Sequence, residues 1–249
     1  MASVFSGNGM RVAYASKASH IGSMQLSRLL KPLYYFFRLA RDPNELDRVF
    51  QMRDSAHDPK LNHAIYERLG QEPSAKAAFE TRARLGTFTL DDLAALPEGS
   101  LGRVYGDFMK RYDLKPEAIP RVDDDGGATY MRAHLYETHD LWHVVTGFLP
   151  DPAGEAGLQA VYAAQLPGML PAALVSALLL NAAIERSSQK TKERFDAVAR
   201  GWEMGQRAKL LFGYPWRDRF AAPLSDVRKE LGIDASLAEA RPLRVVLAS

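Results

Sequence analysis

Ser100–Tyr112, which reads SLGRVYGDFMKRY, is the segment whose pattern is most clearly helical. Ser100 stands immediately before the periodic run, where a serine side chain can accept hydrogen bonds from the first free backbone N–H groups of a helix. The large apolar side chains then recur every three or four residues over three turns, which places them on one helix face. These positions are Leu101, Val104, Tyr105, Phe108, Met109 and Tyr112. The sequence therefore predicts a helix that starts after Ser100 and packs one face against a core.

Helical spacing recurs outside this segment, and no convincing alternating strand pattern interrupts it. It appears around residues 26–40, 61–69, 130–146, 195–202 and 224–231, with Pro32 as a candidate break and Gly70, Gly147 and Gly232 as helix ends. We therefore predict an all-α fold, a single-domain helical bundle. Residues 1–20 form an unassigned basic N-terminal segment, and residues 21–249 form one helical domain.

The composition excludes several classes of protein. The 249 residues include no cysteine, so disulfide scaffolds, thiolate metal sites and thiol nucleophiles are ruled out. Lys and Arg number 32 against 30 Asp and Glu, a net charge of only +2, which argues against a nucleic-acid partner. Any transition-metal site must use histidine and carboxylate ligands.

The charge is unevenly placed along the chain. Six basic residues precede Asp42, the first acidic one, which fits either a mitochondrial transit peptide or an ordinary basic first helix. Residues 156–184 carry no charge, and Leu166–Ile184 approaches the length of a membrane span. Because prolines interrupt this run, three alternatives stay open: a core helix from about Pro171, a helix that meets a bilayer or an apolar ligand, and a true span.

The strongest chemical signal is the sequence HDLWH at residues 139–143. On a helix, His143 lies about 40° and Asp140 about 100° around the axis from His139, so all three point from one side. Glu155 follows after Gly147 and two prolines, which allow the chain to reverse and bring a carboxylate back. The four residues supply the nitrogen and oxygen ligands of a divalent metal ion.

Spacing alone leaves other readings open. Pairs of histidines four residues apart also occur as solvated or hydrogen-bonded core residues. The spacing is similar to the zinc-protease signature H-E-x-x-H, in which the glutamate is a general base. Asp140 is one methylene shorter, which favours a ligand or a hydrogen-bond partner of a ligand over a base. A zinc hydrolase is therefore the weaker alternative.

The motif and several separated stretches resemble the fourth Coq protein family of ubiquinone (coenzyme Q) biosynthesis. The resemblance covers roughly residues 20 to 235, and the four residues of the motif show no departure from the family pattern. It is carried by HDLWH followed by eleven residues and Glu155, and by Leu96–Arg103, Val122–Asp124, Tyr130, Gly154, Tyr214–Phe220 and Val227–Ile233.

The resemblance implies a helical bundle with a divalent metal, usually zinc, held by His139, Asp140, His143 and Glu155. It further implies an apolar channel for a polyprenylated aromatic lipid, a tendency to form a homodimer, and association with other ubiquinone-biosynthesis enzymes. The expected location is peripheral, on the matrix side of the mitochondrial inner membrane or the cytoplasmic side of a bacterial membrane.

Two functions follow from the resemblance. One is metal-dependent oxidative C1 decarboxylation of a polyprenylated hydroxybenzoate, a lyase activity carried by the same four residues. The other is a non-catalytic scaffold that holds lipid intermediates and enzymes. Zinc has no redox chemistry, so iron is the alternative metal. Arg103 and Arg132 are candidate partners for the substrate carboxylate, or ordinary surface arginines.

Overall fold

The computed structural model describes residues 30–43, 51–52, 59–115 and 126–239, in which all regular elements are helices. An isolated bridge between Ser100 and Pro223 is the one β-type pairing in these ranges. The prediction of an all-α fold is confirmed. The chain divides into two compact units, residues 1–57 and 58–249, and each is described by itself. The predicted boundary after residue 20 lies outside the described residues.

In the first unit, residues 30–41 are helical without a break at Pro32. Leu39 and Ala40 are buried, but one stripe at helical spacing remains exposed. The stripe consists of Leu30, Leu33, Tyr34 and Phe37, each about half exposed (52%, 49%, 55% and 54%). Large side chains on this face therefore have little cover.

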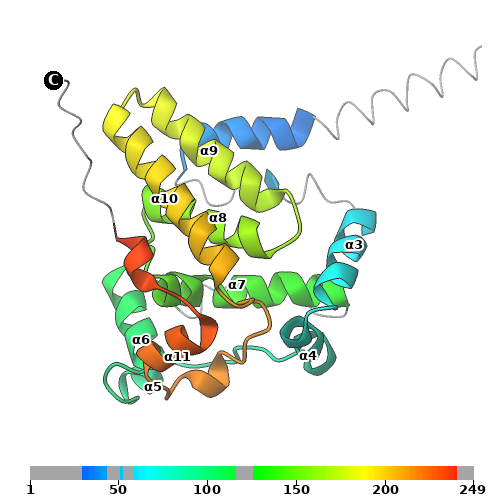
Figure 1. Cartoon of the computed structure of the whole chain (residues 1–249), viewed down its shortest axis with the longest axis vertical. Coiled ribbons are helices and arrows are strands. Elements are labelled where there is room, and N and C mark those ends of the chain that lie inside the picture. Colours follow the sequence, from blue (N-terminus) through cyan, green and yellow to red (C-terminus); the bar gives the residue numbers. More distant parts are fainter. Residues whose placement is uncertain (1–29, 44–50, 53–58, 116–125, 240–249) are drawn as a thin grey trace, which may run out of the picture. The chain divides into compact units, whose positions relative to one another are not determined.

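The second unit contains the remaining helices (Figure 1). They are α3 (Pro59–Leu69), α4 (Pro73–Thr81), α5 (Leu90–Ala94), α6 (Leu101–Arg111), α7 (Gly127–Thr146), α8 (Pro152–Gln165), α9 (Leu170–Ile184), α10 (Ser188–Arg207) and α11 (Leu224–Leu231). Two short 3-10 helices, η2 (Arg217–Arg219) and η3 (Ala235–Ala238), lie in the C-terminal part.

The helix predicted from Ser100–Tyr112 is α6. Ser100 Oγ accepts a hydrogen bond from the backbone N–H of Arg103 at 3.4 Å, which confirms the predicted cap. Leu101, Tyr105 and Met109 of the predicted stripe are fully buried. The apolar face of α6 therefore forms part of the core.

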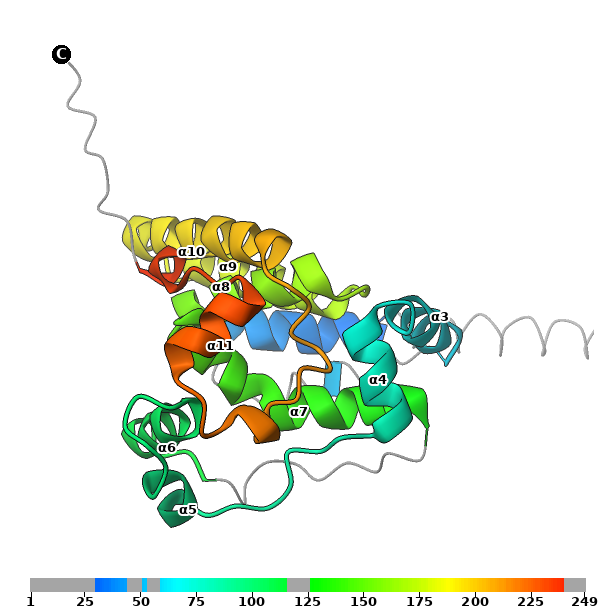
Figure 2. The same ribbon diagram turned by 60° about the horizontal axis from the view of Figure 1, so that its bottom comes forward.

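Helix α7 runs through the middle of this unit and carries the HDLWH motif (Figure 2). At its N-terminal end it meets α3, where the ring of Tyr66 lies against Gly127, and α4, where Phe79 contacts Tyr130. At its C-terminal end it meets α6 and α11. Both ends are thus anchored, which fixes the motif in place.

Helices α8, α9 and α10 pack together beside α7, as Figures 1 and 2 both show. One very close approach is between Gly201 of α10 and Gly157 of α8. A Cβ atom built on Gly201 would lie 2.0 Å from the carbonyl oxygen of Gly157. Only a residue without a side chain fits at this crossing, so the two backbones touch directly.

The charge-free stretch forms most of α8, the loop that follows it and all of α9. The 15-residue α9 buries one face, formed by Leu174, Ala177, Leu178, Asn181 and Ala182, as a core helix does. Among the described residues, no helix has the length and apolarity needed to cross a membrane. The reading as a true span therefore does not hold for α9.

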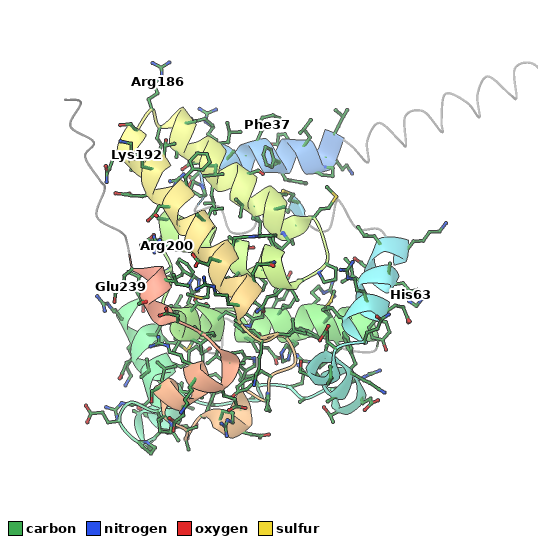
Figure 3. The ribbon with its side chains drawn as sticks, viewed as in Figure 1. Phe37, His63, Arg186, Lys192, Arg200 and Glu239 are labelled. Atoms are coloured by element: carbon green, nitrogen blue, oxygen red, sulfur yellow. The ribbon has the colours of Figure 1, made fainter. Side chains whose placement is uncertain are left out.

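The C-terminal end of the described chain is tied to α10 by Arg200. Its guanidinium group is almost fully buried and donates hydrogen bonds to the carbonyl oxygens of Leu237 and Glu239, each at 2.8 Å. Figure 3 shows Arg200 on α10 and Glu239 just beyond η3. This contact holds η3 against α10.

Candidate metal centre

The motif residues lie in the last two turns of α7, which ends as the sequence predicts. Gly147 has φ +83°, a conformation that glycine adopts without strain, and its N–H bonds to the carbonyl of His143 at 2.8 Å. The side chain of Arg228 on α11 donates to the carbonyl oxygens of Val144 and Val145, both at 2.9 Å. The last turn of α7 is therefore held rigidly.

Glu155 is brought back by a tight start to α8. The side chain of Asp151 accepts hydrogen bonds from the N–H groups of Ala153 and Gly154, at 2.9 and 2.8 Å. Gly154 packs so closely on the preceding loop that a Cβ there would lie 1.9 Å from the carbonyl oxygen of Leu149. This reversal points Glu155, in the first turn of α8, at α7, as predicted from the prolines and glycine.

Three of the four predicted ligands form one cluster. His143 Nε2 lies 3.0 Å and His139 Nε2 lies 3.7 Å from the same oxygen, Oε1 of Glu155. One donor atom from each side chain lies within 4.8 Å of the other two. We call His139, His143 and Glu155 the triad. Its members are buried or half-buried, so it opens toward solvent on one side.

Asp140 lies beside the triad. Among the described residues it is not part of the group whose donors all lie within 4.8 Å of one another. Its negative charge acts on His139, and on the fully buried Tyr105 of α6, whose pKa is raised first by burial and then by Asp140. The structure thus places Asp140 close to the centre without bringing it into the cluster.

His143 is oriented by the backbone. Its Nδ1 lies 2.8 Å from the carbonyl oxygen of Phe148, which can only accept, so Nδ1 carries the proton and donates. In the neutral ring, Nε2 then presents a lone pair to Glu155. The ring is also stacked against Phe108 of α6, with centroids 5.9 Å apart. Imidazoles that bind metals are commonly fixed in this way, through the second ring nitrogen.

His139 is oriented by a residue that the sequence reasoning missed. Its Nδ1 lies 3.3 Å from the hydroxyl of Tyr162 on α8. Tyr162 follows Glu155 by seven residues, two turns of α8, and this spacing is the signal that a search for neighbours of Glu155 would have used. The pKa of Tyr162 is raised by burial and by the charges of Glu155 and Asp140, so the phenol stays neutral.

The triad is strongly coupled electrostatically. Burial alone would raise the pKa of Glu155, but hydrogen bonds to His139 and His143 outweigh it and hold that pKa far below its usual range. Burial likewise opposes protonation of His139, yet Glu155 and Asp140 raise its pKa overall. The carboxylate of Glu155 and the imidazole of His139 therefore favour each other's charged forms.

The donor set fits a divalent metal ion. Two imidazole nitrogens and a carboxylate oxygen match catalytic zinc sites, which keep a further position for water or substrate. The same set suits non-haem iron. The observation that supports this fit is that Nδ1 of His143 is taken by a backbone carbonyl, so its buried Nε2 faces Glu155 at 3.0 Å, where a proton or a cation can lie between the two atoms.

The two predicted arginines lie in different surroundings. Arg103 of α6 donates to the carbonyl of Ala94 at 2.6 Å and lies 3.5 Å from Asp107. Arg132 lies two turns before His139 on α7, and its buried Nε has no hydrogen-bond partner among the described residues. Substrate contact by either arginine stays a prediction, with Arg132 on the same side of α7 as His139.

A helical fold with a histidine and carboxylate cluster between two successive helices defines a class of candidate metal-binding all-α proteins. This chain belongs to the family described as Coenzyme Q (ubiquinone) biosynthesis protein Coq4, whose sequence profile matches residues 18–236. It is thus a protein of ubiquinone biosynthesis, as the resemblance predicts.

Relatives in distant organisms agree with this assignment. The Caenorhabditis elegans protein named "Ubiquinone biosynthesis protein coq-4, mitochondrial" is 27% identical over 224 residues, 87% of this chain and 94% of the relative. The Aedes aegypti homologue, also named mitochondrial, is 29% identical over 78% of this chain and 70% of its own length. A crystal structure of a putative ubiquinone biosynthesis protein from Nostoc punctiforme, 29% identical, superposes with a TM-score of 0.71 over 81% of this chain and 96% of that one.

Proposed function

We propose that this protein binds a divalent metal ion at the triad and catalyses oxidative C1 decarboxylation of a polyprenylated hydroxybenzoate in ubiquinone biosynthesis. The observation that carries the proposal is the convergence of two imidazole Nε2 atoms on one oxygen of Glu155. Zinc is the metal that we propose first, with iron as the alternative.

When bound, the ion would act as a Lewis acid toward the phenol or carboxylate oxygen of the substrate. The triad supplies three protein ligands, which leaves room for such an oxygen. We assign Asp140 as the acceptor of the phenol proton, because its charge acts on His139 although it is not part of the triad. In the net reaction the aromatic acid, water and dioxygen give the hydroxylated ring, carbon dioxide and hydrogen peroxide, so that dioxygen takes up the two electrons that the ring loses.

We further propose that the prenyl tail lies in an apolar channel along the charge-free residues 156–184 of α8 and α9. A tail of this kind needs a long apolar slot. Arg132 would be the partner of the substrate carboxylate, since its position two turns before His139 puts both side chains on one side of α7.

The location that we propose is peripheral to a membrane, on the matrix side of the mitochondrial inner membrane or the cytoplasmic side of a bacterial one. The exposed stripe of Leu30, Leu33, Tyr34 and Phe37, together with the basic residues before Asp42, supports contact with an anionic bilayer. We also propose a homodimer and association with other enzymes of the pathway.

The test of the catalytic proposal uses the purified chain loaded separately with Zn²⁺ and Fe²⁺. A short-chain prenylated hydroxybenzoate is added under air, and carbon dioxide release and hydroxylated product are measured by mass spectrometry. We expect turnover that Glu155→Gln abolishes. The matched control is Glu185→Gln, which removes an exposed-surface pairing with Lys190 at the end of α9 and should keep activity.

The second candidate function, a non-catalytic scaffold, is favoured by the uncovered aromatic side chains of α10. Phe195 is 57% and Trp202 50% exposed. If no metal-loaded form turns over the substrate, the decarboxylase proposal fails. Retained binding of a prenylated lipid, lost in Ala177→Glu on the buried face of α9, would then support the scaffold.

A further inference from the structure

Tyr162 occupies a distinctive position next to the triad. It lies two turns after Glu155 on α8, so both side chains leave the helix on nearly the same side. Its hydroxyl lies 3.3 Å from Nδ1 of His139, while the Nε2 of that ring faces Glu155. The two ring nitrogens of His139 therefore face two different residues of α8: Nδ1 faces Tyr162, and Nε2 faces Glu155.

The ring of Tyr162 is held in place by Trp142. The two rings are stacked almost parallel, with an interplanar angle of 5° and centroids 4.1 Å apart. Trp142 is fully buried and comes three residues after His139 on α7. Because the stack joins α7 to α8 beside the triad, the hydroxyl of Tyr162 has little freedom to move away from His139.

The two histidines differ in what holds them. The side chain of His143 is 1% exposed and bonds to a backbone carbonyl, whereas that of His139 is 34% exposed. Among the described residues, the partner of His139 Nδ1 is the hydroxyl of Tyr162, whereas the partner of His143 Nδ1 is the carbonyl of Phe148. Without it, an exposed imidazole can rotate about χ2 and present the wrong nitrogen.

We infer that Tyr162 is a positioning residue, whose hydroxyl accepts the Nδ1–H of His139 and so keeps Nε2 turned toward the metal position. The inference rests on the metal binding proposed above and adds a residue outside the predicted ligand set. Oxygen partners of this kind orient imidazole ligands, and their removal weakens metal binding by about 10- to 100-fold.

A simpler reading is that Tyr162 is a core aromatic residue whose hydroxyl is incidental. The two readings differ in one atom, because the stacking on Trp142 needs only the ring. Tyr162→Phe keeps that ring and removes the hydroxyl. A purely structural role predicts an unchanged metal site in this variant, and the positioning role predicts a weakened one.

The experiment measures Zn²⁺ affinity of the full chain by competition with a chromophoric chelator, and the visible absorption spectrum with Co²⁺ as the probe. We expect Tyr162→Phe to weaken Zn²⁺ binding by about tenfold and to alter the Co²⁺ spectrum. The matched control is Tyr214→Phe. Tyr214 is also buried, and its hydroxyl donates to Glu230 at 3.0 Å, away from the triad.

Circular dichroism and urea unfolding of the metal-free chains show whether both variants keep the fold. Unchanged affinity and an unchanged Co²⁺ spectrum in folded Tyr162→Phe overturn the inference while leaving the metal proposal intact. An equal loss in Tyr214→Phe also overturns it, because the effect is then not specific to His139. Failure of the wild-type chain to bind either ion defeats the metal proposal together with this inference.

Discussion

His143 Nε2 and Glu155 Oε1 lie 3.0 Å apart, although the two side chains come from successive helices. The other ring nitrogen of His143 is occupied by the carbonyl of Phe148, so the neutral ring has no proton to give to Glu155. Two acceptors at this distance repel each other unless a proton or a cation lies between them. A divalent ion bound by both side chains would satisfy this geometry, as would a second proton on the ring of His143.

We therefore expect His143→Ala to abolish metal binding and to leave the helical fold largely formed. The imidazole is a proposed ligand, whereas α7 is anchored by α3, α4, α6 and α11. Elemental analysis of the purified variant measures the metal, and circular dichroism measures the helices.

The control for this variant is His63→Ala. The side chain of His63 on α3 is 73% exposed and lies 3.9 Å from Glu67. Its removal should change neither metal content nor helicity. Full retention of metal by His143→Ala would remove that residue from the site.

Much of the fold could be predicted because local signals agree with it. The helix end predicted at Gly232 is present and has the Schellman hydrogen bonds: Ile233 N–H bonds to the carbonyl of Arg228 at 2.9 Å, and Gly232 N–H to that of Lys229 at 3.2 Å. Likewise α9 begins at Leu170, beside the predicted Pro171. Caps and helix ends depend on a few adjacent residues, so one sequence suffices to find them.

Tertiary partners could not be predicted in this way. Phe195 and Trp202 helped to predict α10, yet both are exposed. The buried face of that helix is formed by small residues together with Arg194, Arg200 and Met204. Gly201 makes a close backbone crossing possible, so the large side chains point outward. The role of Tyr162 was missed for the same reason, because it depends on how α8 meets α7.

The stability of the protein should fall in mild acid because of His134. This buried histidine accepts a hydrogen bond from the N–H of Gly213, and burial lowers its pKa from 6.5 to about 4. The unfolded chain binds the proton more readily, so the contribution of His134 is complete above pH 6.5 and is lost as the pH falls toward 4. The difference corresponds to about 3 kcal/mol.

Urea unfolding of the wild type and of His134→Gln at pH 7.5 and pH 4.5 checks this expectation. The glutamine offers an acceptor to Gly213 but does not titrate. The loss of stability between the two pH values should be smaller in the variant. Equal losses in both proteins would show that other groups cause the acid sensitivity.

Arg200→Met should destabilise the protein by about 3 kcal/mol, because the carbonyls of Leu237 and Glu239 lose the charged donor that the buried guanidinium supplies. Urea unfolding at pH 7.5 measures the change. Arg207→Met on the same helix is the control. Its side chain is 66% exposed in a pair with Glu203, so it should cost less than about 1 kcal/mol. Similar effects of the two substitutions would contradict the prediction.

Gly201→Ala should cost about 2 to 3 kcal/mol, since its methyl group would collide with the backbone of Gly157 and push α8 from α10. Because Glu155 is also on α8, Zn²⁺ affinity should fall as well. Ala199→Leu adds bulk to the exposed side of α10 and should change neither quantity. Thermal unfolding and chelator competition provide the two measurements.

The reversal between α7 and α8 also bears on how folding and metal loading are related. All three residues of the triad fall within residues 139–155, so an ion bound there would close only a short loop. Cross-linking a loop of this length constrains the unfolded chain by about 3 kcal/mol, less than a longer loop would. That contribution is local to the reversal, and the contacts between the other helices would have to form without it. A metal acquired late, or exchanged for another, would then meet a site that is already formed.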